Sequence, residues 1–153
     1  MPFPFEPDSN HALNQVLVVL HRSLAAYLSY ADPWVAYGNE ESRRIFDRIV
    51  ADKKERVAHL TTLLHARRHV IDFGEFPMDF TSLHDVSLDF LLKGLVEHQR
   101  RDVQTIEGCL GRLMGDAEGR SLGEEVLVNA RRHLQSLEVL VRQPVNKAAS
   151  GAA

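Results

Sequence analysis

Residues 46–64, FDRIVADKKERVAHLTTLL, carry the most regular apolar pattern in this chain. Apolar residues recur there at steps of three and four, which places their side chains on one side of a helix. These residues are Phe46, Ile49, Val50, Val57, Leu60 and Leu64. Lys53 lies in the middle of the stripe, although an unpaired ammonium group is costly to bury. The stretch therefore predicts a long helix that faces a shared core with a polar centre.

Four amphipathic helices account for most of the chain. We expect them over about residues 11–31, 40–70, 82–114, and from about 118 or 122 to 142. Asp32-Pro33 ends the first helix, because a residue before proline avoids the helical conformation. The expected fold is all-α: an antiparallel four-helix bundle with one long crossover connection between the second and third helices.

The connection of residues 71–82 shows no helical periodicity. About 12 extended residues reach up to roughly 40 Å, which covers most of a helix of about 27 residues. A hairpin needs only a few residues, so we expect this connection to run lengthwise along the bundle. Its three phenylalanines, Phe73, Phe76 and Phe80, are expected to fasten it to the helices.

The two ends of the chain differ from the helical part in composition. Residues 1–10 include three prolines, which predicts an extended arm ahead of a bundle over residues 11–142. Phe3 and Phe5 are expected to fix this arm to a surface or to a neighbouring subunit. Residues 143–153 are predicted to form a disordered tail.

Composition narrows the class of protein. With 153 residues, 25% of them charged, and a net charge of -3, the chain has the composition of one soluble domain. Its arginine pairs are short and mostly flanked by acidic residues, so nucleic-acid binding is not expected. No apolar stretch approaches the ~20 residues that span a bilayer, so no membrane association is expected. The single cysteine, Cys109, and a start without a signal-peptide pattern predict a cytoplasmic protein.

Two segments point to a known family. The first helix carries Leu20 and Tyr27, and the fourth carries VLVNARRHLQSL at residues 126–137. Both resemble the ferritin-like superfamily, in particular bacterioferritin- and rubrerythrin-like bundles, and the resemblance covers about residues 11–142. It implies a metal-binding glutamate at the position of Leu20 and a Glu-x-x-His segment in the fourth helix. His133 keeps the histidine of that segment, and Ala130 replaces its glutamate.

The resemblance implies a di-iron site built from six positions. Helical phase assigns the two positions on the second helix to Lys53 and Arg56, and the one on the third helix to Gln99. Of the six, only His133 is a usual metal ligand, so we expect the di-iron site to be lost and no cofactor to be bound. An alternative register instead places Asp52 at a site position of the second helix, together with the outward-facing Glu55.

A polar cluster is expected in place of the metal centre. We expect Lys53 to pair with Asp102, which lies one helical turn beyond Gln99. The expected members of the cluster are Tyr27, Lys53, Arg56, Gln99, Asp102 and His133. Two alternatives for Lys53 remain: an amine that extends into water, or a buried lysine that forms a Schiff base with a carbonyl compound.

No nucleophile elbow, phosphate-binding loop or Ser-His-Asp grouping is present, so no enzyme is expected. The preferred function is that of a non-catalytic ferritin-like bundle, homodimeric through its arm or an outer face such as that of Val86 and Phe90. One alternative is iron handling or oxidation, with iron or another divalent metal on a non-standard His/Glu set. The histidines considered for that set are His21, His98 and His133. Another alternative is a small-anion binding module centred on Lys53 and Arg56, with an unknown ligand.

Overall fold

The computed structural model describes residues 7–31, 33, 40–83 and 86–142, and this part of the chain is helical and contains no strand. Its elements are α1 (Pro7–His21), α2 (Leu24–Ala31), α3 (Glu40–Ala66), the 3-10 helix η1 (Met78–Leu83), α4 (Leu88–Leu110), the 3-10 helix η2 (Gly111–Leu113) and α5 (Ala117–Arg142). The expected all-α class is confirmed. The arm expected at residues 1–6, with Phe3 and Phe5, and the tail expected at 143–153 lie outside the described residues.

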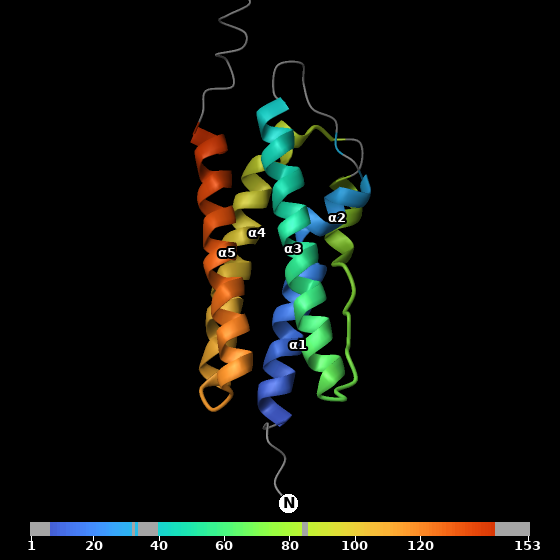
Figure 1. Ribbon diagram of the computed structural model, residues 1–153. Coiled ribbons are helices and arrows are strands. Elements are labelled where there is room, and N and C mark those ends of the chain that lie inside the picture. The colour runs from blue at the N-terminus through green and yellow to red at the C-terminus, as the bar shows by residue number, and fades with distance from the viewer. Residues whose placement is uncertain (1–6, 32, 34–39, 84–85, 143–153) are drawn as a thin grey trace, which may run out of the picture.

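Four long helices, α1, α3, α4 and α5, lie side by side, and α2 continues the chain beyond α1 (Figure 1). α1 and α3 run in opposite directions, and so do α4 and α5. Between α3 and α4 the chain returns along the outside of the molecule, so these two helices run in the same direction. This lengthwise course is the one expected from the length of the connection. No helix in the described ranges is both long and apolar enough to cross a membrane.

The first helix is divided, and the single helix expected there is wrong. α1 begins at Pro7, so residues 7–10 of the expected arm are helical; proline is favoured at a first helical position. α1 ends just before Ser23, whose hydroxyl accepts a hydrogen bond from the Ala26 amide at 3.2 Å. A serine cap of this kind starts a new helix, α2, where the apolar pattern alone predicts a continuous one.

The boundaries of α3 and α4 also differ from the expectation. Arg68 takes a left-handed φ of 58°, which ends helices, so α3 stops before the expected residue 70. Thr81 and Ser82, the predicted caps of α4, lie in η1, and their hydroxyls donate to carbonyl oxygens of the same turn. The cap of α4 is Ser87, whose hydroxyl accepts from the Phe90 amide at 3.2 Å.

Polar contacts hold the crossover against α1. Asn14 Nδ2 donates to the Asp72 carbonyl oxygen at 2.9 Å, and Asn14 Oδ1 accepts from the Asp72 amide at 3.0 Å. Arg22 Nε donates to two carbonyl oxygens of the crossover, each at 3.0 Å. Gly74 has a φ of 71°, and a Cβ atom there would lie 2.7 Å from Val18. The close approach of the crossover to α1 therefore requires glycine at this position.

Aromatic side chains fasten the crossover as well. Phe80 is buried, and its ring lies 5.5 Å from that of Tyr27. Phe76 packs against Tyr27 at 5.2 Å, and the Arg22 guanidinium lies over its face at 4.6 Å. Phe73 is 42% exposed, and its ring contacts that of His21 at 5.6 Å. All three phenylalanines thus contact the α1–α2 part of the chain, as the sequence predicts.

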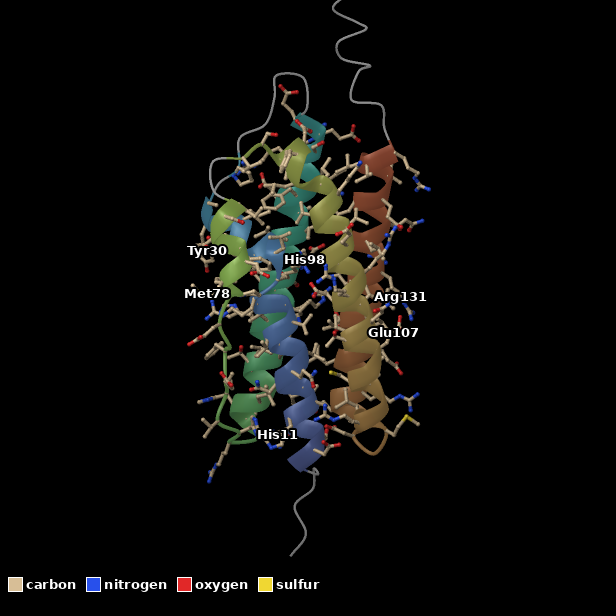
Figure 2. The ribbon with its side chains drawn as sticks, turned by 180° about the vertical axis from the view of Figure 1, so that it is seen from behind. His11, Tyr30, Met78, His98, Glu107 and Arg131 are labelled. Atoms are coloured by element: carbon tan, nitrogen blue, oxygen red, sulfur yellow. The ribbon has the colours of Figure 1, made fainter. Side chains whose placement is uncertain are left out.

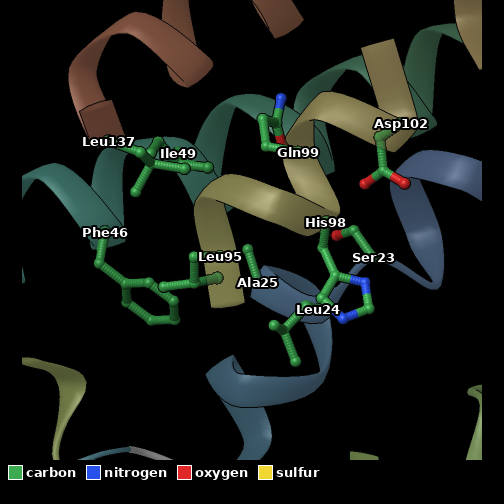
Figure 3. Close-up of a pocket in the computed structure, with 10 residues that line it drawn as sticks. All are labelled: Ser23, Leu24, Ala25, Phe46, Ile49, Leu95, His98, Gln99, Asp102 and Leu137. Atoms are coloured by element: carbon green, nitrogen blue, oxygen red, sulfur yellow. The ribbon is translucent and has the colours of Figure 1, made fainter. Parts of the chain in front are cut away.

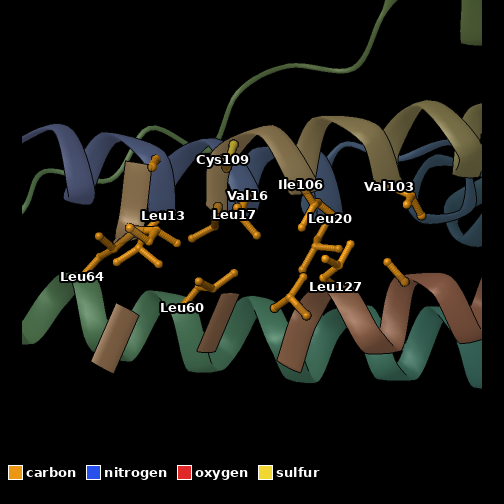
Figure 4. Close-up of a cluster of buried hydrophobic side chains, with 14 residues drawn as sticks. Leu13, Val16, Leu17, Leu20, Leu60, Leu64, Val103, Ile106, Cys109 and Leu127 are labelled. Carbon is orange, nitrogen blue, oxygen red and sulfur yellow. The ribbon is translucent and has the colours of Figure 1, made fainter. Parts of the chain in front are cut away.

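The apolar core consists of two clusters. The lower cluster, in the orientation of Figure 1, joins α1, α3, α4 and α5 (Figure 4), and the upper cluster joins α2, η1 and the other ends of α3, α4 and α5. Lower members include Leu13, Leu17, Leu60, Leu64, Ile106 and Leu127, and upper members include Leu28, Phe46, Ile49, Leu88, Leu95 and Leu137. Along α3, α4 and α5, the two sets are separated by a buried polar residue: Lys53, Gln99 and His133 respectively.

A buried ion pair closes the lower end of the molecule. Arg67, just after α3, donates to both carboxylate oxygens of Asp116, just before α5, at 2.6 and 2.8 Å. The two side chains are only 4% and 3% exposed. Asp116 also accepts from the Ser9 hydroxyl of α1 and, at 2.9 Å, from the Gly119 amide, so it caps α5. One carboxylate therefore joins α1, α3 and α5.

Candidate functional site

Lys53 lies inside the molecule, as the apolar stripe predicts. It is 3% exposed, and its ammonium group donates to Gln99 Oε1 at 3.1 Å. Gln99 Nε2 in turn donates to the Ala130 carbonyl oxygen at 2.9 Å. Lys53 comes from α3, Gln99 from α4 and Ala130 from α5, so this chain of hydrogen bonds crosses the molecule between its two apolar clusters. The alternative of an amine in water is wrong, because the side chain is buried.

Asp102 has an electrostatic effect on Lys53, but the described residues show no ion pair between the two, where the helical phase predicts one. Burial lowers the pKa of Lys53, and the carboxylate of Asp102 opposes this shift. Burial raises the pKa of Asp102 to about 6, against the lowering effects of Lys53 and Arg101. The hydrogen bond of Lys53, however, goes to Gln99. The structure thus gives Lys53 a neutral acceptor and a nearby carboxyl group whose pKa lies close to neutrality.

The raised pKa of Asp102 predicts a pH-dependent stability. The folded value of about 6 lies above the usual 3.8, so this group contributes stability below about pH 3.8 that is lost as the pH rises through about 6. Asparagine mimics the protonated acid and does not titrate. We therefore expect Asp102→Asn to gain about 3 kcal/mol relative to the wild type between about pH 4 and pH 7. Urea unfolding at several pH values measures this, and a pH-independent difference would contradict it.

His133 binds to Asp52, a residue that the preferred register leaves out of the cluster. His133 Nε2 lies 2.9 Å from Asp52 Oδ2, and the histidine side chain is 6% exposed. Burial lowers the pKa of His133, so the neutral ring donates its Nε2–H to the carboxylate. Its Nδ1 is buried and has no hydrogen-bond partner within the described chain. The alternative register, which puts both Asp52 and Glu55 at site positions, is wrong for Glu55, whose side chain is 59% exposed; Lys53 faces inward as the preferred register predicts.

Two expected members of the polar cluster lie elsewhere. Arg56 points to the α3–α5 surface, where its guanidinium pairs with Glu125 at 3.4 Å and Glu55 at 3.6 Å. Tyr27 packs on the crossover aromatics Phe76 and Phe80. Their placement in the cluster needs correction, because carboxylates at the surface attract the arginine and an aromatic cluster attracts the tyrosine. Lys53, Gln99, Asp102 and His133 lie at the level where they were expected.

The residues at this level do not fit a di-iron centre. The described residues contain no group of three or more His, Cys, Asp or Glu side chains that could hold a metal ion. Leu20 is buried among apolar neighbours. The oxygen and the nitrogen of the Gln99 side-chain amide are both engaged in hydrogen bonds. The alternative set of His21, His98 and His133 is not assembled either, because His21 packs on Phe73, His98 on Phe80 at 5.3 Å, and His133 binds Asp52.

A small cavity lies beside Asp102 (Figure 3). Its volume of about 10 Å³ suits roughly one water molecule. Figure 3 shows Asp102 and His98, both from α4, next to Ser23 at the start of α2. Ser23 donates to the Leu20 carbonyl oxygen at 3.0 Å. Polar groups of α2 and α4 thus surround one side of this space.

A larger cavity, of about 140 Å³, lies between the α1–α2 segment and α3. We call it the Lys53 cavity. Its lining residues are Leu20, His21, Ala26, Ser29, Tyr30, Val50, Lys53, Lys54 and Val57. The polar groups in its wall are two lysines, a histidine and two hydroxyls; none of the described residues that line it is acidic. Sequence reasoning missed Ser29, Tyr30 and Lys54, because only the break at Ser23 brings α2 against this part of α3.

The outer surface carries ion pairs and a few apolar side chains. Arg131 of α5 pairs with Glu107 of α4 at 2.9 Å, and Figure 2 labels both on the outside of these helices. Phe90 is 73% exposed, consistent with its expected outward position, whereas Val86 packs partly against the upper cluster.

Comparison of the chain with protein-family models, with curated proteins and with solved structures finds no match.

Proposed function

We propose that this chain is a ferritin-like bundle that works as a non-catalytic, metal-independent binding protein for a small organic anion. The two antiparallel helix pairs and the lengthwise crossover support the ferritin-like arrangement. The observation that carries the binding function is the Lys53 cavity, because a buried lysine lies in its wall. The hydrogen-bonded residues Lys53, Gln99 and Ala130 lie at the height along the bundle where the family resemblance implies metal ligands.

The lining of the cavity defines the class of ligand. Lys53, Lys54 and His21 offer positive charge or N–H donors, and Tyr30 offers a hydroxyl donor; the Ser29 hydroxyl donates to the Ala26 carbonyl oxygen at 2.6 Å. The remaining lining side chains are apolar: Leu20, Ala26, Val50 and Val57. A volume of about 140 Å³ is close to that of cavities that hold benzene. A carboxylate with a short apolar body, of the size of butyrate, fits both the size and the polarity.

The proposed anion site leaves out Arg56. Arg56 lines a different, shallow groove together with Glu124 and Glu125. Its guanidinium lies within salt-bridge distance of Glu55 and Glu125, which compete with any added anion. The proposal therefore centres the site on Lys53, Lys54 and the Tyr30 hydroxyl.

Isothermal titration calorimetry with butyrate tests this function. We expect binding to the wild-type protein and at least about a tenfold loss of affinity in Lys53→Met, or about 1.4 kcal/mol, since one charged donor is removed. Methionine keeps the size of the lysine stem and fills the core. Arg56→Met is the matched control, because it removes a cation outside the cavity. Equal affinity of Lys53→Met and the wild type, or no binding of butyrate, would contradict the proposal.

Metal analysis separates this function from the iron-handling alternative. Protein purified without chelators is expected to contain iron and manganese well below one ion per chain, because the side chains at the centre include a cation and an apolar residue where ligands are needed. Stoichiometric iron or manganese in that preparation would favour the metalloprotein.

A further inference from the structure

We propose that the ligand of the Lys53 cavity is a small 2-oxo carboxylate, and that Lys53 captures its carbonyl group reversibly as an imine. This inference rests on the anion-binding function proposed above and adds a covalent step to it. It arises from the neighbours of Lys53, which differ from those of a lysine that only balances charge.

Within the described ranges, no carboxylate forms an ion pair with the Lys53 amine. Its hydrogen bond goes to the neutral Gln99 Oε1 at 3.1 Å, and an amide oxygen can accept from an ammonium group or from a neutral amine. Burial lowers the pKa of Lys53, which increases the share of the nucleophilic neutral form. The side chain forms part of the cavity wall, and its four-carbon stem lets the amine turn from Gln99 into the cavity.

Asp102 lines the small cavity and not the Lys53 cavity, and it is the carboxyl group that acts electrostatically on Lys53. Its pKa of about 6 lets it exchange a proton near neutral pH. The other charged or titratable groups around Asp102 and the small cavity beside it are Arg101 and His98 of α4. The amine nitrogen bonds to the carbonyl carbon, and the two amine protons pass to the carbonyl oxygen, which leaves as water. The products are an imine and one water molecule, so no oxidant or reductant is needed.

The remaining polar groups of the cavity suit the carboxylate of such a ligand. Lys54 follows Lys53 on α3 and is exposed, so it can meet a carboxylate at the cavity entrance. Tyr30 contributes a hydroxyl from α2 on the opposite side, whereas the Ser29 hydroxyl donates to the Ala26 carbonyl oxygen within α2. A 2-oxo acid places its carbonyl carbon next to its carboxylate, so one end is held by charge while the other faces Lys53.

Trapping with cyanoborohydride tests the covalent step. The wild-type protein is incubated with pyruvate and cyanoborohydride near pH 7 and analysed by intact-mass and peptide mass spectrometry. We expect a mass increase of one reduced pyruvate located at Lys53, and a loss of this label when excess butyrate is present. Lys93, which is exposed and lies outside the cavity, is the internal control in the same sample, and Lys53 is expected to be labelled more than Lys93.

The outcomes distinguish the imine from simple binding. Label at Lys53 that butyrate suppresses, and that Arg56→Met retains, supports the proposal. Binding of butyrate and pyruvate in calorimetry without label at Lys53 overturns the imine and leaves the anion site standing. Equal labelling of Lys53 and Lys93 also overturns it, since this is the reactivity of any lysine. Failure of both ligands to bind overturns the imine together with the function on which it rests.

Discussion

Replacing Asp116 by alanine is expected to lower the free energy of unfolding by about 3–5 kcal/mol, the largest effect of any single substitution considered for this chain. The change leaves the guanidinium of Arg67 buried without its carboxylate partner. It also removes the cap of α5, worth about 1 kcal/mol, and the acceptor of the Ser9 hydroxyl. Chemical denaturation followed by circular dichroism measures the loss.

Acid titration gives an independent measure of the same group. Burial tends to raise the pKa of Asp116, but hydrogen bonds from Arg67, Ser9 and Gly119 lower it from 3.8 to about 2. A lowered folded value means that the stabilisation is present above about pH 3.8 and is lost as the pH falls through about 2. The pKa difference corresponds to about 2 kcal/mol, which Asp116→Ala should no longer lose on acidification.

Glu124→Ala is a matched control for the ion pair. Glu124 pairs with Arg120 at 2.9 Å on the exposed face of α5, and its side chain is 53% exposed. An exposed pair four residues apart on a helix contributes only about 0.3–0.5 kcal/mol. If the Asp116→Ala and Glu124→Ala losses were similar, the buried pair would not be the main connection at this end of the molecule.

Gln99→Leu is the substitution with the second largest expected effect, a loss of about 3 kcal/mol. Leucine has similar size but leaves the Lys53 ammonium group without its acceptor and removes the side-chain donor to the Ala130 carbonyl oxygen, both inside the core. A buried charged group that loses its hydrogen bond costs more than a neutral one. Urea denaturation near pH 7 checks this value.

The double variant Lys53→Met with Gln99→Leu tests whether the buried charge of Lys53 causes the stability loss of Gln99→Leu. Removing the cation together with its acceptor replaces the polar contact by apolar packing, which often costs little. We expect the double variant to be more stable than Gln99→Leu alone, so the two substitutions are strongly non-additive. Additive losses would show that Gln99 stabilises the fold through packing and not through Lys53.

The sequence predicts the level of the polar layer well, because helical phase is a local property. Lys53, Gln99 and His133 each replace an apolar residue in an otherwise regular stripe, and each is buried in the structure. The long unpatterned link likewise predicts the crossover, because its length decides how far it can reach. These inferences need only the period of the helix and the length of the chain between helices.

The partners of these residues are harder to predict, because they depend on the rotation and height of neighbouring helices. Arg56 and Asp52 are four residues apart on α3, yet Arg56 meets Glu125 at the surface and Asp52 meets His133 at the edge of the core. Phase places both near the flank of the apolar stripe and does not say which neighbour each one meets. The Lys53 cavity was also not predicted, since it depends on Ser23 ending α1.

The break at Ser23 has a consequence for how a ligand reaches Lys53. α2 has its own hydrogen-bonded start and carries Ala26, Ser29 and Tyr30, the cavity residues opposite α3. A short helix that begins at a cap can pivot about it without unwinding the helix before it, as hinged elements do in other proteins. Leu24, Ala25 and Leu28 of α2 belong to the upper cluster, so any tilt of α2 that widened the entrance of the Lys53 cavity would also loosen that cluster.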